Sequence, residues 1–335
     1  MKILFVGYFF PPWSSHHPFV KYLRKNHYVD TFDFRYVKNS RAQNFLLYQK
    51  LNAFLNNSLY PLLSKSFKTF KFYINGYWRK NRELLDKVKN NRYDLVILSK
   101  ADSINYKIIP KLNKYTKTFY YFMDQLSNAI RLNAHRYAAM STWSSASFSD
   151  VTQLFRREGA NCYHMIEGFN DEIFKPSKNK VAKEFDVIFA GSISSKRENY
   201  INFLRKNRVN VICFGNGWDN DPIYLEKLSD TYNKSKIVLN FTRGKIGISD
   251  RVVFVLGTNS FLISEYCHDI EKFFEKGIHL EWFKTKSDLL NLINFYLKND
   301  EIREKIAKQA SKYVFENYTW EKYFDKFLKF SKINQ

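Results

Sequence analysis

The chain has 335 residues, a length typical of two domains of roughly 150 residues each. Hydrophobic residues make up 45% of it, with 11 Gly and 7 Pro, which excludes a disordered or low-complexity protein. The net charge of +22 is concentrated in residues 1–180, which hold 29 Lys and Arg against 12 Asp and Glu. This charge favours an anionic partner, such as a membrane surface, a phosphorylated substrate or a nucleic acid.

The cysteines and the N-terminus indicate a cytoplasmic protein. Cys162, Cys213 and Cys267 have no metal-type spacing and lie in or beside apolar runs, as buried thiols do. The N-terminal MKILFVGYFFPP has a short apolar stretch and no small-residue cleavage site, which favours a first strand over a signal peptide. No apolar run approaches the roughly 18 residues that a membrane span requires.

The first half of the chain alternates apolar strand-like runs with amphipathic runs. Such alternation predicts a parallel sheet with helices on both faces, an α/β fold. The expected strands are 2–9, 28–35, 93–100 and 116–124. The expected helices are 17–26, two or three within 41–90, 103–115 and 149–160.

The second half repeats this alternation and predicts a second doubly wound domain. The expected strands are 186–192, 210–217, 235–241 and 259–266, and the closing helices are 286–299 and 301–317. We expect domains at 1–178 and 179–318, with a hinge near 176–180 and a helix over 319–335 that could cross back to the first domain. Ligands of paired sheets of this kind bind in the crevice outside the carboxyl ends of the strands.

The stretch DVIFAGSISSKRENY (186–200) predicts a phosphate site. Gly191 and Ser192 end a strand just before a helix, where backbone N–H groups lie at the positive end of the helix dipole. Lys196 and Arg197 add positive charge and a bidentate fork for phosphate oxygens. A diphosphate is the expected ligand, and a plain turn followed by a solvated basic pair is the alternative.

The next strand also ends in glycines, in FGNGWDN (214–220). Gly215, Asn216 and Gly217 would allow backbone contact with a flat ligand or its ribose. A tight turn without a ligand explains the same residues equally well.

The order of these motifs resembles a known family. EGFNDEIFKPSK, DVIFAGSISSKRENYINFL, VICFGNGW, YNKSKIVLNFT and SDRVVFVLGTNSFLISEY resemble the C-terminal half of GT-B fold glycosyltransferases. Within them, the chain resembles the spore-maturation CgeB-like branch near the family 4 retaining enzymes. The resemblance covers roughly 160–320, and residues 1–160 match in pattern only. It implies two Rossmann-like domains facing each other across a cleft, and transfer of a sugar from a nucleotide-diphosphate donor to an acceptor hydroxyl.

The resemblance also implies roles for particular residues. Gly191, Lys196 and Arg197 would contact the diphosphate, and Gly215 to Gly217 would lie near the nucleoside. Ser249 and Arg251 would line the donor pocket. No cofactor other than the donor sugar nucleotide is expected, and no metal ion, because cationic side chains and helix N-termini would balance the phosphate charge.

The chain departs from its relatives at a pair of acids. They usually carry a Glu-x7-Glu pair that contacts the ribose and the sugar, whereas Ile246 and Phe254 stand at those positions here. Glu265, at the end of the next strand, could take over such a contact. Alternatively, Glu265 caps the helix that follows.

Two side chains of the first domain are candidates for the catalytic base. Relatives tend to have a histidine after the fourth or fifth strand, where this chain has Met123 and Asp124. Asp124 at a strand end could accept a proton from an acceptor hydroxyl, or it could cap the next helix. His16, in PPWSSHHPF (11–19), exchanges a proton near neutral pH, although a solvent-facing histidine pair explains it as well.

The acceptor and two alternative functions stay open at this point. Residues 65–92 combine aromatic residues at helical spacing with many cations, as in a helix on an anionic membrane surface or in an ordinary amphipathic helix. A lipid-linked, glycan or protein acceptor at the inner face of a membrane would suit this charge. The missing acids also fit a binding protein with a decayed donor site. A nucleic-acid binder is less favoured, because the chain has no recognised nucleic-acid motif.

Overall fold

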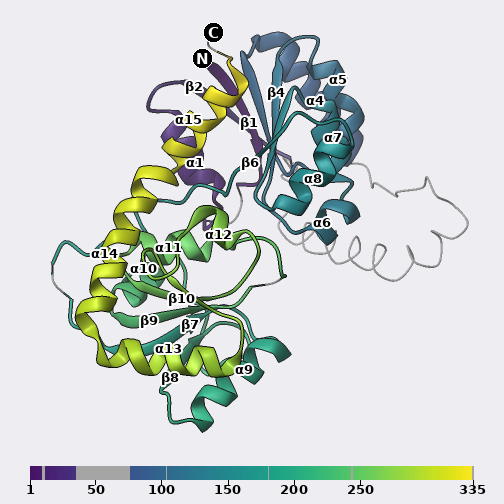
Figure 1. Ribbon diagram of the computed structural model, residues 1–335. Helices are drawn as coiled ribbons and strands as arrows, with labels where there is room; N and C mark the ends of the chain where they lie inside the picture. The colour runs from purple at the N-terminus through teal and green to yellow at the C-terminus, as the bar shows by residue number, and fades with distance from the viewer. Residues whose placement is uncertain (10–11, 35–75, 103, 180, 243, 334–335) are drawn as a thin grey trace, which may run out of the picture.

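The computed structural model describes residues 1–9, 12–34, 76–102, 104–179, 181–242 and 244–333. In these residues the chain forms two parallel sheets, one above the other in Figure 1, each covered by helices on both faces. Two parallel-sheet α/β domains confirm the fold class that the alternating pattern predicts. The helices expected between 41 and 75 lie outside the described residues.

The first sheet has six strands in the order β2-β1-β3-β4-β5-β6. Its strands are β1 (Lys2–Gly7), β2 (Tyr28–Asp33), β3 (Leu95–Ser99), β4 (Lys117–Phe122), β5 (Trp143–Ala146) and β6 (Cys162–His164). β1, β3 and β4 are apolar along almost their whole length because both of their faces are buried, as is usual in parallel sheets.

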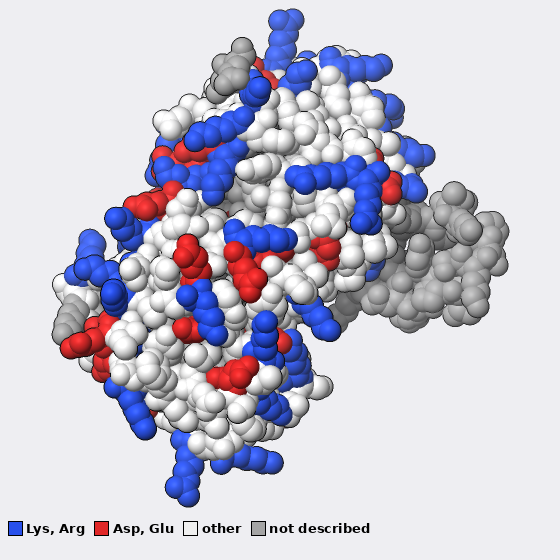
Figure 2. Space-filling view, viewed as in Figure 1, with Lys and Arg blue, Asp and Glu red and all other residues white. Residues whose placement is uncertain are grey.

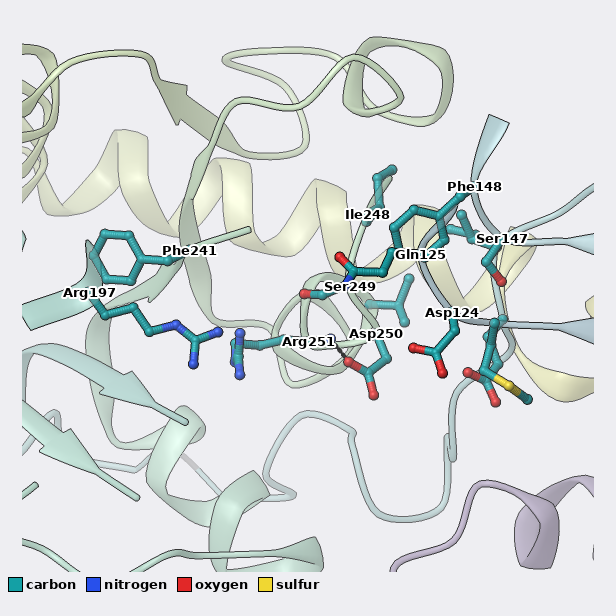
Figure 3. A pocket seen from close by; sticks show the side chains of 14 residues that line it. Asp124, Gln125, Ser147, Phe148, Arg197, Phe241, Ile248, Ser249, Asp250 and Arg251 are labelled. Carbon is teal, nitrogen blue, oxygen red and sulfur yellow. Dashed lines mark hydrogen bonds between the residues drawn. The ribbon is translucent and has the colours of Figure 1, made fainter. Parts of the chain in front are cut away.

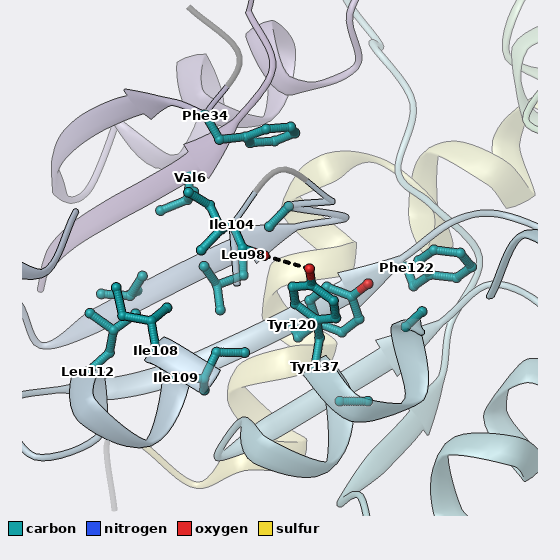
Figure 4. Close-up of a cluster of buried hydrophobic side chains, with 14 of the residues drawn as sticks. Val6, Phe34, Leu98, Ile104, Ile108, Ile109, Leu112, Tyr120, Phe122 and Tyr137 are labelled. Carbon is teal, nitrogen blue, oxygen red and sulfur yellow. Dashed lines mark hydrogen bonds between the residues drawn. The ribbon is translucent and has the colours of Figure 1, made fainter. Parts of the chain in front are cut away.

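Helices cover both faces of this sheet. One face carries α4 (Gly76–Asn91), η2 (Tyr106–Ile108), α5 (Ile109–Leu112), α6 (Leu126–Arg131), α7 (Ala134–Met140) and α8 (Ser149–Arg157). The core of this face is shown in Figure 4, where the Tyr137 hydroxyl donates to the Ile104 carbonyl at 2.5 Å and its ring stacks on Tyr120. The other face carries α1 (His16–Leu23) and the C-terminal helix α15 (Trp320–Ser331).

The second sheet has five strands in the order β11-β10-β9-β7-β8. They are β7 (Phe185–Ala190), β8 (Val211–Phe214), β9 (Ser235–Asn240), β10 (Phe261–Glu265) and β11 (Glu281–Phe283). Its helices are α9 (Ser195–Lys206), α10 (Leu225–Asn233), α11 (Arg251–Gly257), α12 (Ile270–Phe273), α13 (Lys286–Lys298) and α14 (Asp300–Asn317). α9 and α13 pack on one face, and α10, α11 and α12 on the other.

The chain crosses between the domains twice. The segment after β6 leads to the second domain, and α15 returns to the first, where it lies beside α1 (Figure 1). The Trp320 ring stacks on Phe19 with centroids 4.4 Å apart, and Phe327 stacks on Phe119 at 4.0 Å. These buried aromatic contacts fix how the first domain sits on the C-terminal segment.

The expected elements agree with the structure except where strands are short. Each predicted strand occurs and ends one to three residues before its predicted C-terminal end, and each begins within two residues of its predicted start. Three strands were not predicted, namely β5, β6 and β11. In β5 the buried side chains include Ser144 and Ser145, so no apolar run marks this strand. The helix expected at 103–115 is shorter, consisting of η2 and α5. Cys162, Cys213 and Cys267 are buried, as predicted.

Candidate functional site

A cavity of about 230 Å³ lies between the two domains, at the carboxyl ends of strands from both sheets (Figure 3). Its lining comes from the loops after β4, β5 and β9, the segment after β6, the start of α9 and the residues around the start of α11. The lining residues are Met123, Asp124, Gln125, Ser147, Phe148, Ile166, Glu167, Arg197, Phe241, Ile248, Ser249, Asp250, Arg251 and Val253. Parallel sheets place ligands at this position.

Two arginines of the second domain form one wall of the cavity, which we call the cationic wall. Arg197 and Arg251 lie side by side in Figure 3, and both guanidinium groups lie over the ring of the buried Phe189, at 5.2 and 5.4 Å. Gly191 allows this approach, because a Cβ there would lie 2.8 Å from Arg251 Nη2 and its φ is +152°. Two convergent guanidinium groups repel each other unless an anion lies between them.

Polar groups at the end of β9 hold this wall in place. The amide oxygen of Asn240, a fully buried residue, accepts from Arg251 Nη1 at 2.8 Å and from the Ser249 hydroxyl at 3.1 Å. Arg197 Nη1 donates to the Ser192 carbonyl at 2.7 Å. The structure brings Arg197, Ser249 and Arg251, which the sequence assigns to the donor pocket, together in one cavity. Asn240 was not predicted, although its position at a strand end signals it.

Lys196 and Glu265 pair with each other and are not among the residues that line the cavity. Lys196 Nζ lies 2.6 Å from Glu265 Oε1. Glu265 Oε2 also accepts from the backbone N–H and the hydroxyl of Thr242, at 2.9 and 3.0 Å. The pair therefore joins α9 to the loop after β9, which differs from the predicted roles of Lys196 on the diphosphate and Glu265 on the sugar nucleotide.

The loop with Gly215, Asn216 and Gly217 supports the Gly191 turn and does not line the cavity. A Cβ on Gly215 would lie 2.5 Å from the Gly191 carbonyl oxygen, and the backbone carbonyl of Asn216 accepts from the Ile193 N–H at 2.9 Å. These close contacts explain why glycine is needed at position 215, and the nucleoside contact stays a prediction.

Acidic side chains are also absent from the positions where relatives carry the Glu-x7-Glu pair. The ring of Phe254 stacks on Phe174 with centroids 4.3 Å apart, so this position is part of the packing around α11. An Asp-x-Asp sequence, a pattern that can bind a metal ion, occurs at Asp219 and Asp221 in the loop after β8. Both aspartates are exposed and neither lines the cavity.

The first domain contributes Asp124 to the opposite side of the cavity. Asp124 follows β4, as expected, and Oδ2 of its carboxylate lies 2.5 Å from Lys100 Nζ. It caps no helix, because α6 begins after Gln125, which lacks a side-chain capping bond. The ion pair fixes the Asp124 carboxylate against the loop after β3.

His16 is buried in the first domain and lies outside the cavity lining. Its Nδ1 accepts from the Tyr8 N–H at 2.9 Å, and its Nε2 lies 2.6 Å from the Ser99 hydroxyl. The ring thus links the ends of β1 and β3, with both nitrogens bonded to protein groups. This placement gives no support to the predicted role of His16 as proton acceptor, which stays a prediction.

Glu167 is a cavity residue that sequence reasoning did not select. It lies on the segment that joins the domains, and its Oε1 accepts from the Ser15 hydroxyl at 2.6 Å. The pKa of its carboxyl group is raised to about 8, chiefly by burial; the Ser15 hydrogen bond opposes the rise, Asp250 and Asp124 add to it, and Lys100 opposes it. Together with Asp124 and Asp250, Glu167 forms what we call the acidic wall.

The charge of the surface is spread widely. Lys and Arg side chains project from both domains on the face shown in Figure 2, without gathering in one patch. Of the segment proposed as a membrane-surface helix, 65–75 lies outside the described residues and the side chains of 76–79 are not described. None of the helices in the described ranges combines the length and apolarity of a membrane-spanning helix.

Two facing parallel-sheet domains with a cavity at their strand ends define a GT-B fold. Residues 196–329 match the model of a family described as glycosyl transferase-like. A search of curated proteins found no significant match.

Solved structures with the same fold span the whole chain. HepE from Anabaena, in complex with UDP and glucose, is 13% identical, with 98% of each chain covered and a TM-score of 0.67. Sucrose-phosphate synthase from Thermosynechococcus elongatus is 9% identical, over 99% of this chain and 98% of the other, with a TM-score of 0.61. A glycosyltransferase from Rickettsia africae is 13% identical, over 100% and 98%, with a TM-score of 0.60. These likenesses confirm the predicted GT-B fold.

Proposed function

We propose that this protein is a glycosyltransferase that moves a sugar from a nucleoside-diphosphate donor to an acceptor hydroxyl. The observation that carries the proposal is the pair of guanidinium groups, Arg197 and Arg251, at the carboxyl ends of β7 and β9 in the interdomain cavity. The family match over residues 196–329, which includes both arginines, and a structural neighbour that binds UDP-glucose support it.

The cationic wall would stabilise the departing nucleotide. As the bond between the sugar and the phosphate breaks, negative charge develops on the diphosphate. Donors fixed before the reaction stabilise such charge strongly, because they need not reorganise during it. Arg197 and Arg251 have this character, since Phe189, Asn240 and the Ser192 carbonyl hold them in position.

Finer features of the function are also proposals. We propose that the enzyme acts without a metal ion, with the two arginines balancing the diphosphate charge. The basic first domain suits an acceptor at an anionic surface, such as a lipid-linked or surface glycan at the inner face of a membrane. The motifs over 160–320 support a place near the CgeB-like branch of GT-B enzymes.

Nucleotide binding and turnover test the proposal. Thermal-shift titrations with UDP, GDP, CDP and dTDP should show stabilisation by at least one nucleotide, because a ligand of the folded state raises Tm. The enzyme should release nucleotide from at least one sugar donor that carries a nucleotide it binds, such as UDP-glucose, when alkyl glycosides are present as acceptors. Arg197→Ala and Arg251→Ala should each weaken nucleotide binding about 10- to 100-fold, since charged hydrogen bonds contribute about 1.5–3 kcal/mol.

Arg205→Ala is the matched control. Arg205 lies on α9 like Arg197, but it donates to the Val211 carbonyl and does not line the cavity. Its variant should bind nucleotide like the wild type. A wild type that binds no nucleoside diphosphate contradicts the proposal. Binding without turnover of any donor would instead favour a binding protein with a decayed site, for which Phe254 in place of the expected acid is the supporting observation.

A further inference from the structure

Glu167 sits on a backbone segment that the C-terminus holds rigidly. The neighbouring Gly168 packs against Trp320, where a Cβ would lie 2.7 Å from the indole ring. The Phe169 N–H donates to the Tyr318 carbonyl at 3.1 Å, and its side chain is fully buried. The Glu167 side chain is therefore presented to the cavity from a fixed backbone, as a catalytic group requires.

Charged and titratable groups surround this carboxyl group from several elements. Ser15, in the loop before α1, donates to its Oε1. Asp124 after β4, Asp250 before α11 and Lys100 after β3 all act on its charge. The buried phenols of Tyr121 and Tyr323 are near enough for Glu167 to contribute to their raised pKa values, after burial, and both stay neutral at ordinary pH.

Asp124 and Glu167, two carboxylates of the acidic wall, are bonded to different partners. Asp124 is ion-paired with Lys100 at 2.5 Å, whereas Glu167 accepts a neutral hydrogen bond from Ser15 at 2.6 Å. Burial raises the pKa of Glu167 to about 8, near the pH at which enzymes work. A general base is most effective when its pKa is close to the working pH.

We propose that Glu167 is the catalytic base of the transfer reaction, and that Asp124 with Lys100 is a positioning pair beside it. The inference deepens the proposed function and rests on it. In this step the acceptor oxygen forms a bond to the anomeric carbon while its proton passes to a Glu167 carboxylate oxygen. The bond from the anomeric carbon to the phosphate oxygen breaks, and its electron pair leaves with the diphosphate toward Arg197 and Arg251.

The pH dependence follows from this assignment. The base must be ionised, and a carboxyl group with a raised pKa is mostly protonated at pH 7. Transfer should therefore rise with pH until it levels off above about pH 8. Loss of the Asp124 charge would favour ionisation of Glu167, because Asp124 raises its pKa. Loss of Lys100 would act in the opposite direction.

The experiment measures nucleotide release between pH 5.5 and 9.5 with the donor and alkyl glycoside that the wild type uses. Glu167→Gln should lower kcat about 10²- to 10⁴-fold and remove the acidic limb of the profile. Asp124→Asn should keep the limb and move it to lower pH, whereas Lys100→Met should move it to higher pH. Thermal shift with UDP should show that Glu167→Gln still binds nucleotide within a few-fold of the wild type.

Failure of this inference and failure of the proposed function give different results. A wild type without turnover of any donor overturns the proposed function and this inference with it. Turnover by the wild type with an unchanged acidic limb in Glu167→Gln overturns the inference alone. Loss of the limb in Asp124→Asn and its retention in Glu167→Gln would assign the base to Asp124 and also overturn it.

Discussion

The two walls of the cavity carry opposite charge and are built in different ways. The cationic wall comes from one domain, where Arg197 and Arg251 lie on a shared aromatic ring. The acidic wall combines Asp124 of the first domain, Glu167 of the connecting segment and Asp250 of the second domain. A reaction that releases an anion on one side and a proton on the other needs this separation. In the proposed reaction, the leaving group would therefore be stabilised within one domain, whereas proton transfer would depend on how the domains meet.

Loss of the Trp320 side chain, which packs against the segment that carries Glu167, should lower stability more than the other changes. Trp320→Ala removes a buried indole that stacks on Phe19 and packs against Gly168. Truncation of a buried aromatic residue costs about 3–5 kcal/mol. We expect a fall in Tm of about 5–10 °C, measured by thermal unfolding.

Trp13→Ala is the control for this variant. Trp13 is 55% exposed and stacks on Tyr224 of the second domain, with centroids 4.9 Å apart. An exposed stacked pair contributes about 0.5–1.5 kcal/mol, so this variant should unfold near the wild-type temperature. Equal losses in the two variants would show that α15 does not hold the domains as described.

The ionisation of Glu167 should also change the free energy of unfolding with pH. Its pKa is raised on folding from 4.5 to about 8, so its contribution to stability is full below pH 4.5 and is lost as pH rises through 8. This shift is equivalent to at most about 5 kcal/mol, and we expect about 2–3 kcal/mol after local relaxation. Glu167→Gln should therefore gain stability relative to the wild type between pH 5.5 and 9, measured by urea unfolding. Parallel stability curves for the two proteins would contradict the raised pKa.

A smaller change to the cationic wall should weaken nucleotide binding. In Gly191→Ala the new methyl group meets Arg251 Nη2 at 2.8 Å and the residue has a φ of +152°, which favours glycine. We expect a 5- to 50-fold weaker affinity for UDP, about 1–2.5 kcal/mol, measured by calorimetric titration. Gly159→Ala is the control, because its φ is +83° but no atom lies within 4 Å of the added group. Equal effects on UDP affinity would show that the Arg251 position is unimportant.

The smallest effect is expected at Lys196. It is bonded to Glu265 and the Thr242 carbonyl, outside the cavity lining. Lys196→Ala should change UDP affinity by less than threefold, measured in the same titrations, in contrast to Arg197→Ala. A loss as large as that of Arg197→Ala would mean that the pair with Glu265 opens and that Lys196 joins the cationic wall.

The fold and the cationic wall could be predicted because their signals are local. Apolar runs separated by amphipathic ones mark the strands β1, β3, β7 and β9, and the arginines follow strand ends within one domain. Short strands such as β5 escape this reasoning, since buried serines replace its apolar residues.

Of the acidic wall, Asp124 could be predicted from its place at a strand end, whereas Glu167 could not, because its signals are distant in sequence. Glu167 is the first residue of the motif EGFNDEIFKPSK. However, its contact with Ser15 joins residues 152 positions apart, and its burial depends on domain packing. The partners of His16 and Lys196 are hidden from the sequence for the same reason. Each has the right chemistry, but the folded chain pairs it with Ser99 or Glu265, and no sequence pattern shows these partners.

A crystal structure of the complex with UDP tests the central claim most directly. We predict that the diphosphate lies in the interdomain cavity with its oxygens in contact with the guanidinium groups of both Arg197 and Arg251. A diphosphate bound elsewhere, with both arginines still resting on Phe189 and away from the ligand, would contradict the account.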